Sequence, residues 1–484
     1  MHPDPDACYR AICARDARCD GRFYTAVLST GIYCRPTCQA RTPLRRNVRF
    51  YLFAAAAQQA GFRPCLRCRP HAAPDLGVRQ LQAGAVARAL ALIELGALQQ
   101  DGVGALARRL GLGERELRRR FHEQVGAAPR TVERTRRMMH ALQLLEQTGL
   151  PAAEIARAAG LPDARRLDAR LRGHGAPAAG AQRRARGAVV SIARGDEIEL
   201  RLPYAAPYDW PSILDFLRRR AITGVEAVGA DSYARTFEID GMPGTLDVRP
   251  GPGDALLARI RVADAATLPQ VVARLRRVFD LAIDPLHVGR HLARDATLAP
   301  LVARRPGLRL PGAWDGFELA IRAVLGQQIT VAAAAQLAAR LVVRHGEPLD
   351  PPVRELTHRF PRPAALEGAD LGTLGLPRSR AATLVAVAAA VRERPRLLDP
   401  DCGLDEAVLR LRAVRGIGEW TAQYIAMRQL RECDAFPAAD VALQRALTDG
   451  AGRRPTEREL LERANPWRPW RAYAAQHLWT ALAD

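Results

Sequence analysis

Two segments in the first 180 residues place apolar side chains at helical spacing on both sides of a glycine. The first, GVGALARRLGLGERELRRRF at 102–121, has an apolar face that ends at Gly111 and a basic second half. The second, PAAEIARAAGLPDARRLDARL at 151–171, repeats the arrangement around Gly160. A helix, a glycine-centred turn and a second helix form a helix-turn-helix, so the pattern predicts two such units. Two amphipathic hairpins that only pack on each other would show the same pattern.

From about residue 193 the pattern changes to alternation with a period of two. IELRLPY at 198–204, TLDVRP at 245–250 and LLARIRV at 256–262 predict strands of a half-exposed antiparallel sheet, with helices at 212–220 and 268–279. Helical spacing returns from about residue 301 and continues to the end. We therefore expect a multidomain protein, mainly α with α+β parts, divided at 1–75, 80–180, a linker at 181–195, 196–300 and an all-α part at 301–484.

Charge narrows the class of partner. The formal net charge is +21 and the sequence pI about 10.7, and every basic residue other than histidine is arginine. Such an excess favours binding to a polyanion such as DNA, although a GC-rich coding bias would also enrich arginine. The first twenty residues lack a secretory pattern and no apolar run is long enough for a membrane span, so we expect a cytoplasmic protein with no membrane partner.

Cysteines are concentrated near the start of the chain. Cys34 and Cys38 lie four residues apart, and Cys65 and Cys68 lie three apart. Two close pairs across a loop are typical of a four-sulfur zinc site, although ordinary buried cysteines are the plain alternative. The sequence therefore predicts Zn²⁺ as a cofactor.

Residues 18–70, which include GIYCRPTC and GFRPCLRC, resemble the N-terminal domain of Ada-type DNA-repair regulators. The resemblance implies that Cys34 accepts a methyl group from a DNA methylphosphotriester. The two predicted helix-turn-helix units resemble an AraC-type DNA-binding domain. That likeness implies promoter DNA and RNA polymerase as partners.

A short glycine loop occurs in AVRGIGEWTAQY at 413–424. Apolar positions on both sides indicate that Gly416, Ile417 and Gly418 connect two helices, and glycines there would let a DNA backbone approach closely. An ordinary helix–helix turn fits equally well. Asp440 follows Pro437 where another helix would start, and taken alone it fits an N-cap.

Residues 201–482, with APYDW, VLGQQI, LGLPRSRA, GIGEWTAQY and PWRPWRAYAAQHLW, resemble the helix-hairpin-helix DNA glycosylases of the AlkA (3-methyladenine DNA glycosylase II) type. The resemblance implies base flipping, release of 3-methyladenine and 7-methylguanine, and a monovalent cation at the hairpin loop. It also implies specific roles: Asp440 is catalytic, Gln328 fills the gap left by the flipped base, and the base pocket is lined by Trp420, Tyr424, Trp479 and Phe216. Each aromatic residue alone could equally be core.

Bifunctional glycosylases carry a lysine just after the hairpin glycines, where this chain has Trp420, and the sequence contains no lysine. We therefore expect a monomeric, monofunctional enzyme that acts on alkylated double-stranded DNA and leaves an abasic site. The competing hypothesis is a transcription regulator whose glycosylase-like half only binds DNA.

Overall fold

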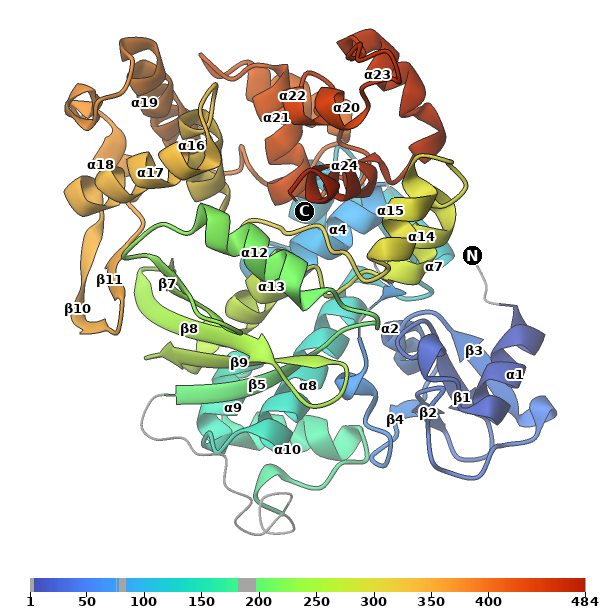
Figure 1. Ribbon diagram of the computed structural model, residues 1–484. Coiled ribbons are helices and arrows are strands. Elements are labelled where there is room, and N and C mark those ends of the chain that lie inside the picture. The colour runs from blue at the N-terminus through green and yellow to red at the C-terminus, as the bar shows by residue number, and fades with distance from the viewer. Residues whose placement is uncertain (1–3, 75, 78–83, 182–196, 484) are drawn as a thin grey trace.

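The computed structural model describes residues 4–74, 76–77, 84–181 and 197–483 (Figure 1). The expected multidomain, mainly α fold with α+β parts is confirmed. Of the expected linker at 181–195, only Ala181 lies among the described residues. In the described ranges, no helix has both the length and the apolar character needed to cross a membrane.

The N-terminal part is a small four-stranded sheet in the order β3-β1-β2-β4. Strands β2 and β4 run parallel, with Tyr33 opposite Pro64, so the residues that follow them, Cys34 at the end of β2 and Cys65 after β4, come out side by side. The elements are α1 (Pro5–Ala14), β1 (Tyr24–Val27), β2 (Ile32–Cys34), β3 (Val48–Tyr51), α2 (Ala54–Gln59) and β4 (Arg63–Pro64).

Both predicted helix-turn-helix units form. Their turns pass through Gly111 at φ +69° and Gly160 at φ +64°, a left-handed conformation that favours glycine. The helices are α4 (Ala85–Glu94), α5 (Ala97–Gln100), α6 (Val103–Arg109), α7 (Glu114–Gln124), α8 (Pro129–Gln147), α9 (Ala152–Ala158) and α10 (Ala164–Gly173).

A five-stranded antiparallel sheet follows, in the order β5-β9-β8-β7-β6. Its strands are β5 (Glu197–Pro203), β6 (Glu226–Val228), β7 (Tyr233–Ile239), β8 (Met242–Pro250) and β9 (Ala255–Val262). The predicted helices are present as α12 (Trp210–Arg220) and α13 (Leu268–Val278). Strands β6 and β7 were not individually predicted.

The second helix-turn-helix unit is docked on this sheet rather than separate from it. Gln143 of α8 donates to the Arg201 carbonyl over 2.8 Å, and Gln147 accepts from the Arg201 N–H over 2.8 Å, so two glutamines cover the edge of strand β5. Buried residues of α8 to α10 and of the sheet form one continuous core. The regulator-like and glycosylase-like halves therefore share a hydrophobic core.

The rest of the chain is helical except for one hairpin. Helices α14 and α15 share a core with α22 and α24, and the expected boundary at 301 falls inside α15. Strands β10 (Glu347–Val353) and β11 (Leu356–Arg359) pair, which corrects the expectation of an all-α part. The helices are α14 (Pro285–Leu292), α15 (Leu298–Arg304), α16 (Gly316–Leu325), α17 (Val331–His345), α18 (Pro363–Leu366), α19 (Arg378–Glu393), α20 (Leu404–Arg412), α21 (Glu419–Ile425), α22 (Val441–Ala446), α23 (Glu457–Arg463) and α24 (Arg471–Ala481).

Candidate active site and metal centre

The glycine loop joins α20 to α21, and its two glycines have different reasons to be glycine. Gly416 has φ +87°, and a Cβ there would lie 1.9 Å from Oγ1 of Thr383 on α19. Gly418 has no atom within 4 Å of its Cβ position. The Ile417 side chain is buried in the helical core, so only its backbone is available to a ligand. Gly416 thus fits the loop onto α19, while the surface at Gly418 stays open.

The GQQ segment between α16 and α17 lies against this loop. Gln327 donates to the Gly416 carbonyl over 3.2 Å and to Oγ1 of Thr421 over 3.1 Å. The neighbouring Gln328 is exposed and has φ +57°, which is uncommon for a residue other than glycine. Gln327 therefore attaches the segment to the hairpin, and Gln328 is left projecting.

Asp440 is both an N-cap and the meeting point of two tryptophans. Its Oδ1 accepts from the Leu443 N–H that starts α22 and from Nε1 of Trp479, each over 3.0 Å. Its Oδ2 accepts from Nε1 of Trp420 over 2.7 Å. Three N–H donors from separate helices fix the orientation of this carboxylate, so the capping and catalytic interpretations do not exclude each other.

The predicted pocket aromatics line one cavity of about 1510 Å³ together with Asp440 and Gln328. Trp420 stacks on Tyr424 with ring centroids 5.2 Å apart and an angle of 7° between the planes, and Trp479 meets Tyr424 edge-on at 6.5 Å. Phe216 reaches the cavity from α12, which precedes the C-terminal helical part of the chain. One face of Trp420 is therefore used by Tyr424, and its N–H is used by Asp440.

The sequence interpretation missed Arg428, which lies beneath these rings. Its guanidinium carbon is 4.7 Å from the ring centroid of Phe216 and 5.4 Å from those of both Tyr424 and Trp479, and the residue is 2% exposed. It donates to the Pro311 carbonyl over 3.0 Å and to Oε1 of Gln476 over 2.9 Å. Burial lowers the pKa of Arg428 to about 10, which leaves it charged at neutral pH.

A second arginine completes the cationic side of the cavity. Arg220, the last residue of α12, has its guanidinium carbon 4.0 Å from the Phe216 ring centroid. Burial alone would raise the pKa of the Tyr424 hydroxyl, but the charges of Arg428 and Arg220 and their hydrogen bonds bring that pKa below its ordinary value. The aromatic pocket thus already contains two cations.

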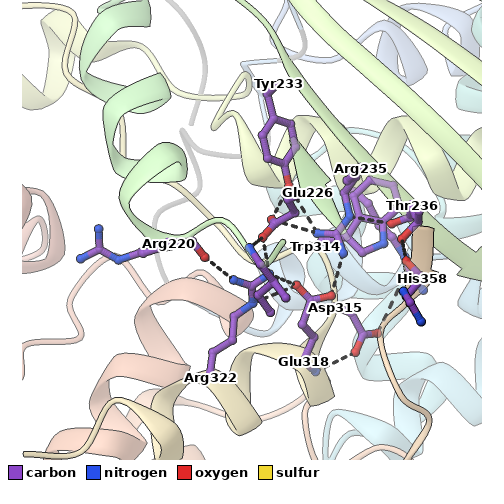
Figure 2. A network of polar contacts seen from close by, with 12 residues as sticks. Arg220, Glu226, Tyr233, Arg235, Thr236, Trp314, Asp315, Glu318, Arg322 and His358 are labelled. Carbon is purple, nitrogen blue, oxygen red and sulfur yellow. Dashed lines mark hydrogen bonds and ion pairs between the residues drawn. The ribbon is translucent and has the colours of Figure 1, made fainter. Parts of the chain in front are cut away.

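A buried ion network forms the wall where the sheet meets α16 (Figure 2). Arg322 donates to Glu226 and Glu318 over 2.6 Å each and to the Arg220 carbonyl over 2.7 Å. Arg235 donates to Glu318 over 2.7 Å. Because burial alone would raise the pKa of Glu318, the two arginines must outweigh it to hold that pKa near 2.

Replacing Glu318 with glutamine should destabilise the protein by about 3 kcal/mol, because it leaves two buried guanidinium groups with one carboxylate fewer. The folded pKa of Glu318 lies below its ordinary 4.5, so its contribution is complete above that pH and is lost as the pH falls toward 2. Urea denaturation at neutral pH measures the difference. Glu462→Gln, in an exposed pair with Arg458, should change stability by less than about 0.5 kcal/mol; equal losses would contradict the prediction.

The four predicted zinc ligands gather at one end of the small sheet. The sulfurs of Cys34, Cys38, Cys65 and Cys68 all lie within 4.8 Å of one another. Bonds of about 2.3 Å from each sulfur to one Zn²⁺ suit this spacing, so the donor set fits the ion. The Arg35 N–H lies 3.3 Å from the Cys68 sulfur.

Four family models match the chain in the order of these parts. The metal binding domain of Ada matches residues 7–71 and a helix-turn-helix domain matches 106–174. The AlkA N-terminal domain matches 199–315, and the HhH-GPD superfamily base excision DNA repair protein matches 321–469. These matches cover both the thiol cluster and the hairpin.

Comparison of the whole chain shows that the similarity also covers the segments between the four matched domains. The chain is 40% identical to the probable bifunctional transcriptional activator/DNA repair enzyme AlkA of Mycobacterium tuberculosis (strain CDC 1551 / Oshkosh), over 100% of this chain and 97% of that protein. It is 36% identical to DNA-3-methyladenine glycosylase 2 of Escherichia coli (strain K12), over 57% of this chain and 95% of that protein. In fold, it matches the 3-methyladenine DNA-glycosylase from Archaeoglobus fulgidus with a TM-score of 0.52 at 23% identity, over 58% and 96% of the two chains. The chain belongs to the family of bifunctional transcriptional activator/DNA repair enzymes of the AlkA type, in which an Ada metal-binding domain and a helix-turn-helix precede a base-excision DNA glycosylase.

Proposed function

We propose that the protein is a monofunctional DNA-3-methyladenine glycosylase II that releases alkylated bases such as 3-methyladenine and 7-methylguanine from double-stranded DNA. The observation that carries this proposal is the Asp440 carboxylate. It is held by Trp420 and Trp479 at the edge of an aromatic cavity, beside a glycine loop with an open surface. A fixed negative charge next to a space for the base stabilises the positive charge that develops on the sugar during glycosidic hydrolysis.

The base must leave the duplex before this cavity can hold it. Flipping a nucleotide costs a few kcal/mol, which contacts in the pocket and in the vacated gap offset. In this proposal the Gln328 side chain fills the gap. Two observations support the role: Gln327 attaches the segment to the hairpin loop, and the Gln328 side chain is exposed. The backbone at Gly418 contacts the phosphates of the damaged strand in this proposal, which the open surface there supports.

Cleavage of the glycosidic bond builds positive charge on the sugar. The Asp440 carboxylate stabilises that charge and orients the attacking water, while its indole donors prevent it from turning away. Without any lysine in the sequence, no lysine side chain can form a Schiff base with the opened sugar. The product is therefore an intact strand with an abasic site.

This product distinction is directly measurable. A duplex with one 7-methylguanine, incubated with the protein, should yield free base and a strand that breaks only after alkali treatment. Gel analysis with and without alkali tests this, and adding a separate abasic-site lyase provides the positive control. Breaks formed by the protein alone, without alkali, would overturn the monofunctional assignment.

We further propose that Cys34 accepts a methyl group from DNA methylphosphotriesters. Bound Zn²⁺ would keep the four thiols ionised, since a metal-bound thiol loses its proton, and four thiolates around one divalent ion carry a net charge of minus two. The Cys34 sulfur attacks the methyl carbon, and the phosphate oxygen leaves with the bonding electrons. The transfer replaces a thiolate with a neutral thioether, which removes a negative charge near the DNA backbone and raises affinity for DNA.

Cys34→Ala should abolish methyl transfer while leaving base release intact, because the cavity lies in another part of the fold. Transfer of labelled methyl groups from DNA to protein measures the first activity. Cys13→Ala, which removes an exposed cysteine outside the cluster, should transfer normally. Retained transfer by Cys34→Ala would reject the assignment.

The helix-turn-helix units bind DNA in this proposal, and methylation of Cys34 strengthens binding at promoters. RNA polymerase as a partner, association with the nucleoid in the cytoplasm, a monomeric state and a monovalent cation at the hairpin loop stay predictions. The proposed domain limits also stay predictions: 1–75, 80–180, 196–300 and 301–484.

A further inference from the structure

Two arginines lie against the aromatic rings of the pocket, on surfaces that a pocket for a cationic base would leave free. Arg220 and Arg428 have their guanidinium carbons 4.0 and 4.7 Å from the ring centroid of Phe216. In the described part of the chain, neither forms an ion pair with a carboxylate. Arg220 donates to the Phe216 carbonyl, and Arg428 donates to the Pro311 carbonyl and to the amide oxygen of Gln476. Both guanidinium groups also hydrogen-bond to the Tyr424 hydroxyl. The local positive charge is therefore not neutralised by a paired acid.

This placement is built into the fold. Arg322 donates to the Arg220 carbonyl over 2.7 Å and is itself held by Glu226 and Glu318, so the last turn of α12 is fixed to α16 and the sheet (Figure 2). Arg428 lies in η6 (Ala426–Leu430), a π-helical turn directly after α21 that turns its side chain under Tyr424. Such turns occur frequently at functional sites.

The chemistry of the leaving base decides what these cations can do. A base alkylated at a ring nitrogen departs neutral, because the electron pair of the broken C1′–N bond cancels its positive charge. An uncharged lesion base departs as an anion and needs a cation or a proton donor beside it. A cationic base would instead be repelled by a guanidinium.

We propose that Arg220, supported by Arg428, is a specificity-determining residue that stabilises uncharged lesion bases as they depart with negative charge. This inference rests on the proposed glycosylase function. The C1′–N bond breaks with its electron pair going to the base, and the oxygen of a water bonds to C1′. The water loses one proton to solvent and the departing base takes one up from solvent, so the reaction consumes one water. Arg220 contacts the base, and Arg428 positions Phe216 and Tyr424 around it.

The test compares two bases that differ by one methyl group and one charge. Duplexes carrying a single deoxyinosine or a single N7-methyldeoxyinosine are incubated with excess full-length protein, and single-turnover release is corrected for spontaneous depurination. Arg220→Met should slow release of hypoxanthine about 10- to 100-fold, the loss of one charged hydrogen bond. It should speed release of the cationic base about twofold or more, since a repelling charge is gone. Arg220→Lys should recover part of the hypoxanthine rate.

Arg218→Met provides the matched control on the same helix, because Arg218 is exposed and lies outside the cavity lining. It should leave both rates unchanged. Equal slowing of both bases by Arg220→Met would overturn this inference and assign Arg220 a structural role, with the glycosylase assignment intact. Release of neither base by the wild-type protein would overturn the proposed function and this inference together.

Discussion

Asp440→Asn should lower the rate of base release about 10²- to 10³-fold at saturating DNA, which is about 3–4 kcal/mol of barrier. The substitution keeps the size of the side chain and one oxygen, so it can still cap α22 through the Leu443 N–H. It removes the negative charge and one of the two oxygens that the indole groups of Trp420 and Trp479 engage. Single-turnover release of 7-methylguanine measures the effect.

The control must separate charge from capping. Asp370 accepts from the Gly372 N–H over 3.0 Å at the start of a short helical turn, and it is exposed and outside the cavity lining. Asp370→Asn should release base at the wild-type rate. Affinity of Asp440→Asn for a duplex with an abasic-site analogue should also stay close to wild type. If Asp440→Asn releases base at the wild-type rate, Asp440 is only a cap.

The sequence pattern predicted the elements whose spacing is regular. The helices on both sides of Gly111 and Gly160, and the strands at 198–204, 245–250 and 256–262, appear where the apolar periods placed them. Strands β10 and β11 were not predicted, because Pro348, Pro351 and Pro352 lack the N–H that a ladder needs. Their pairing is irregular, with a register shift between Pro348 and Val353.

The docking of α8 on strand β5 could not be predicted from the sequence either. A glutamine in an amphipathic helix normally faces water, and nothing in its local pattern shows that Gln143 will meet the Arg201 carbonyl. The contact depends on the twist of a sheet built from residues far along the chain. Tertiary geometry of this kind has no periodic signal.

In the candidate site, the sequence predicted which residues line the cavity better than it predicted what those residues contact. Trp420 was expected in the base pocket and does line the cavity, but its stacking on Tyr424 and its hydrogen bond to Asp440 had no signal in the sequence. Arg428 was missed because an arginine four residues after Tyr424 on an amphipathic helix resembles a solvated residue. Only the π-helical turn at 426–430 brings it under the rings. The position of the charge therefore depends on one local irregularity of the backbone.

Removal of the metal should unfold the N-terminal part and spare base release. The small sheet and α1 bury few apolar side chains: Tyr24, Ala26, Tyr33, Ala54 and Ala57 form one cluster, and Cys8, Ile12 and Phe23 form another. So few side chains cannot offset the entropy of ordering the chain, whereas a structural Zn²⁺ contributes on the order of 10 kcal/mol. Chelation should therefore make residues 20–70 sensitive to limited trypsin digestion and abolish methyl transfer.

Base release should persist after chelation, because every residue lining the cavity lies between Pro211 and Ala483. Cys65→Ser should reproduce the effect of the chelator, since Cys65 is a buried member of the cluster. Cys433→Ser should not, since Cys433 is a partly buried residue packed against the helical core and lies outside the cluster. Zinc content, measured by elemental analysis on the same samples, links loss of the metal to the digestion pattern. An N-terminal part that stays protease-resistant without metal would show that the thiols pack as an ordinary core. Loss of base release together with the metal would instead show that the shared core transmits the unfolding to the glycosylase half.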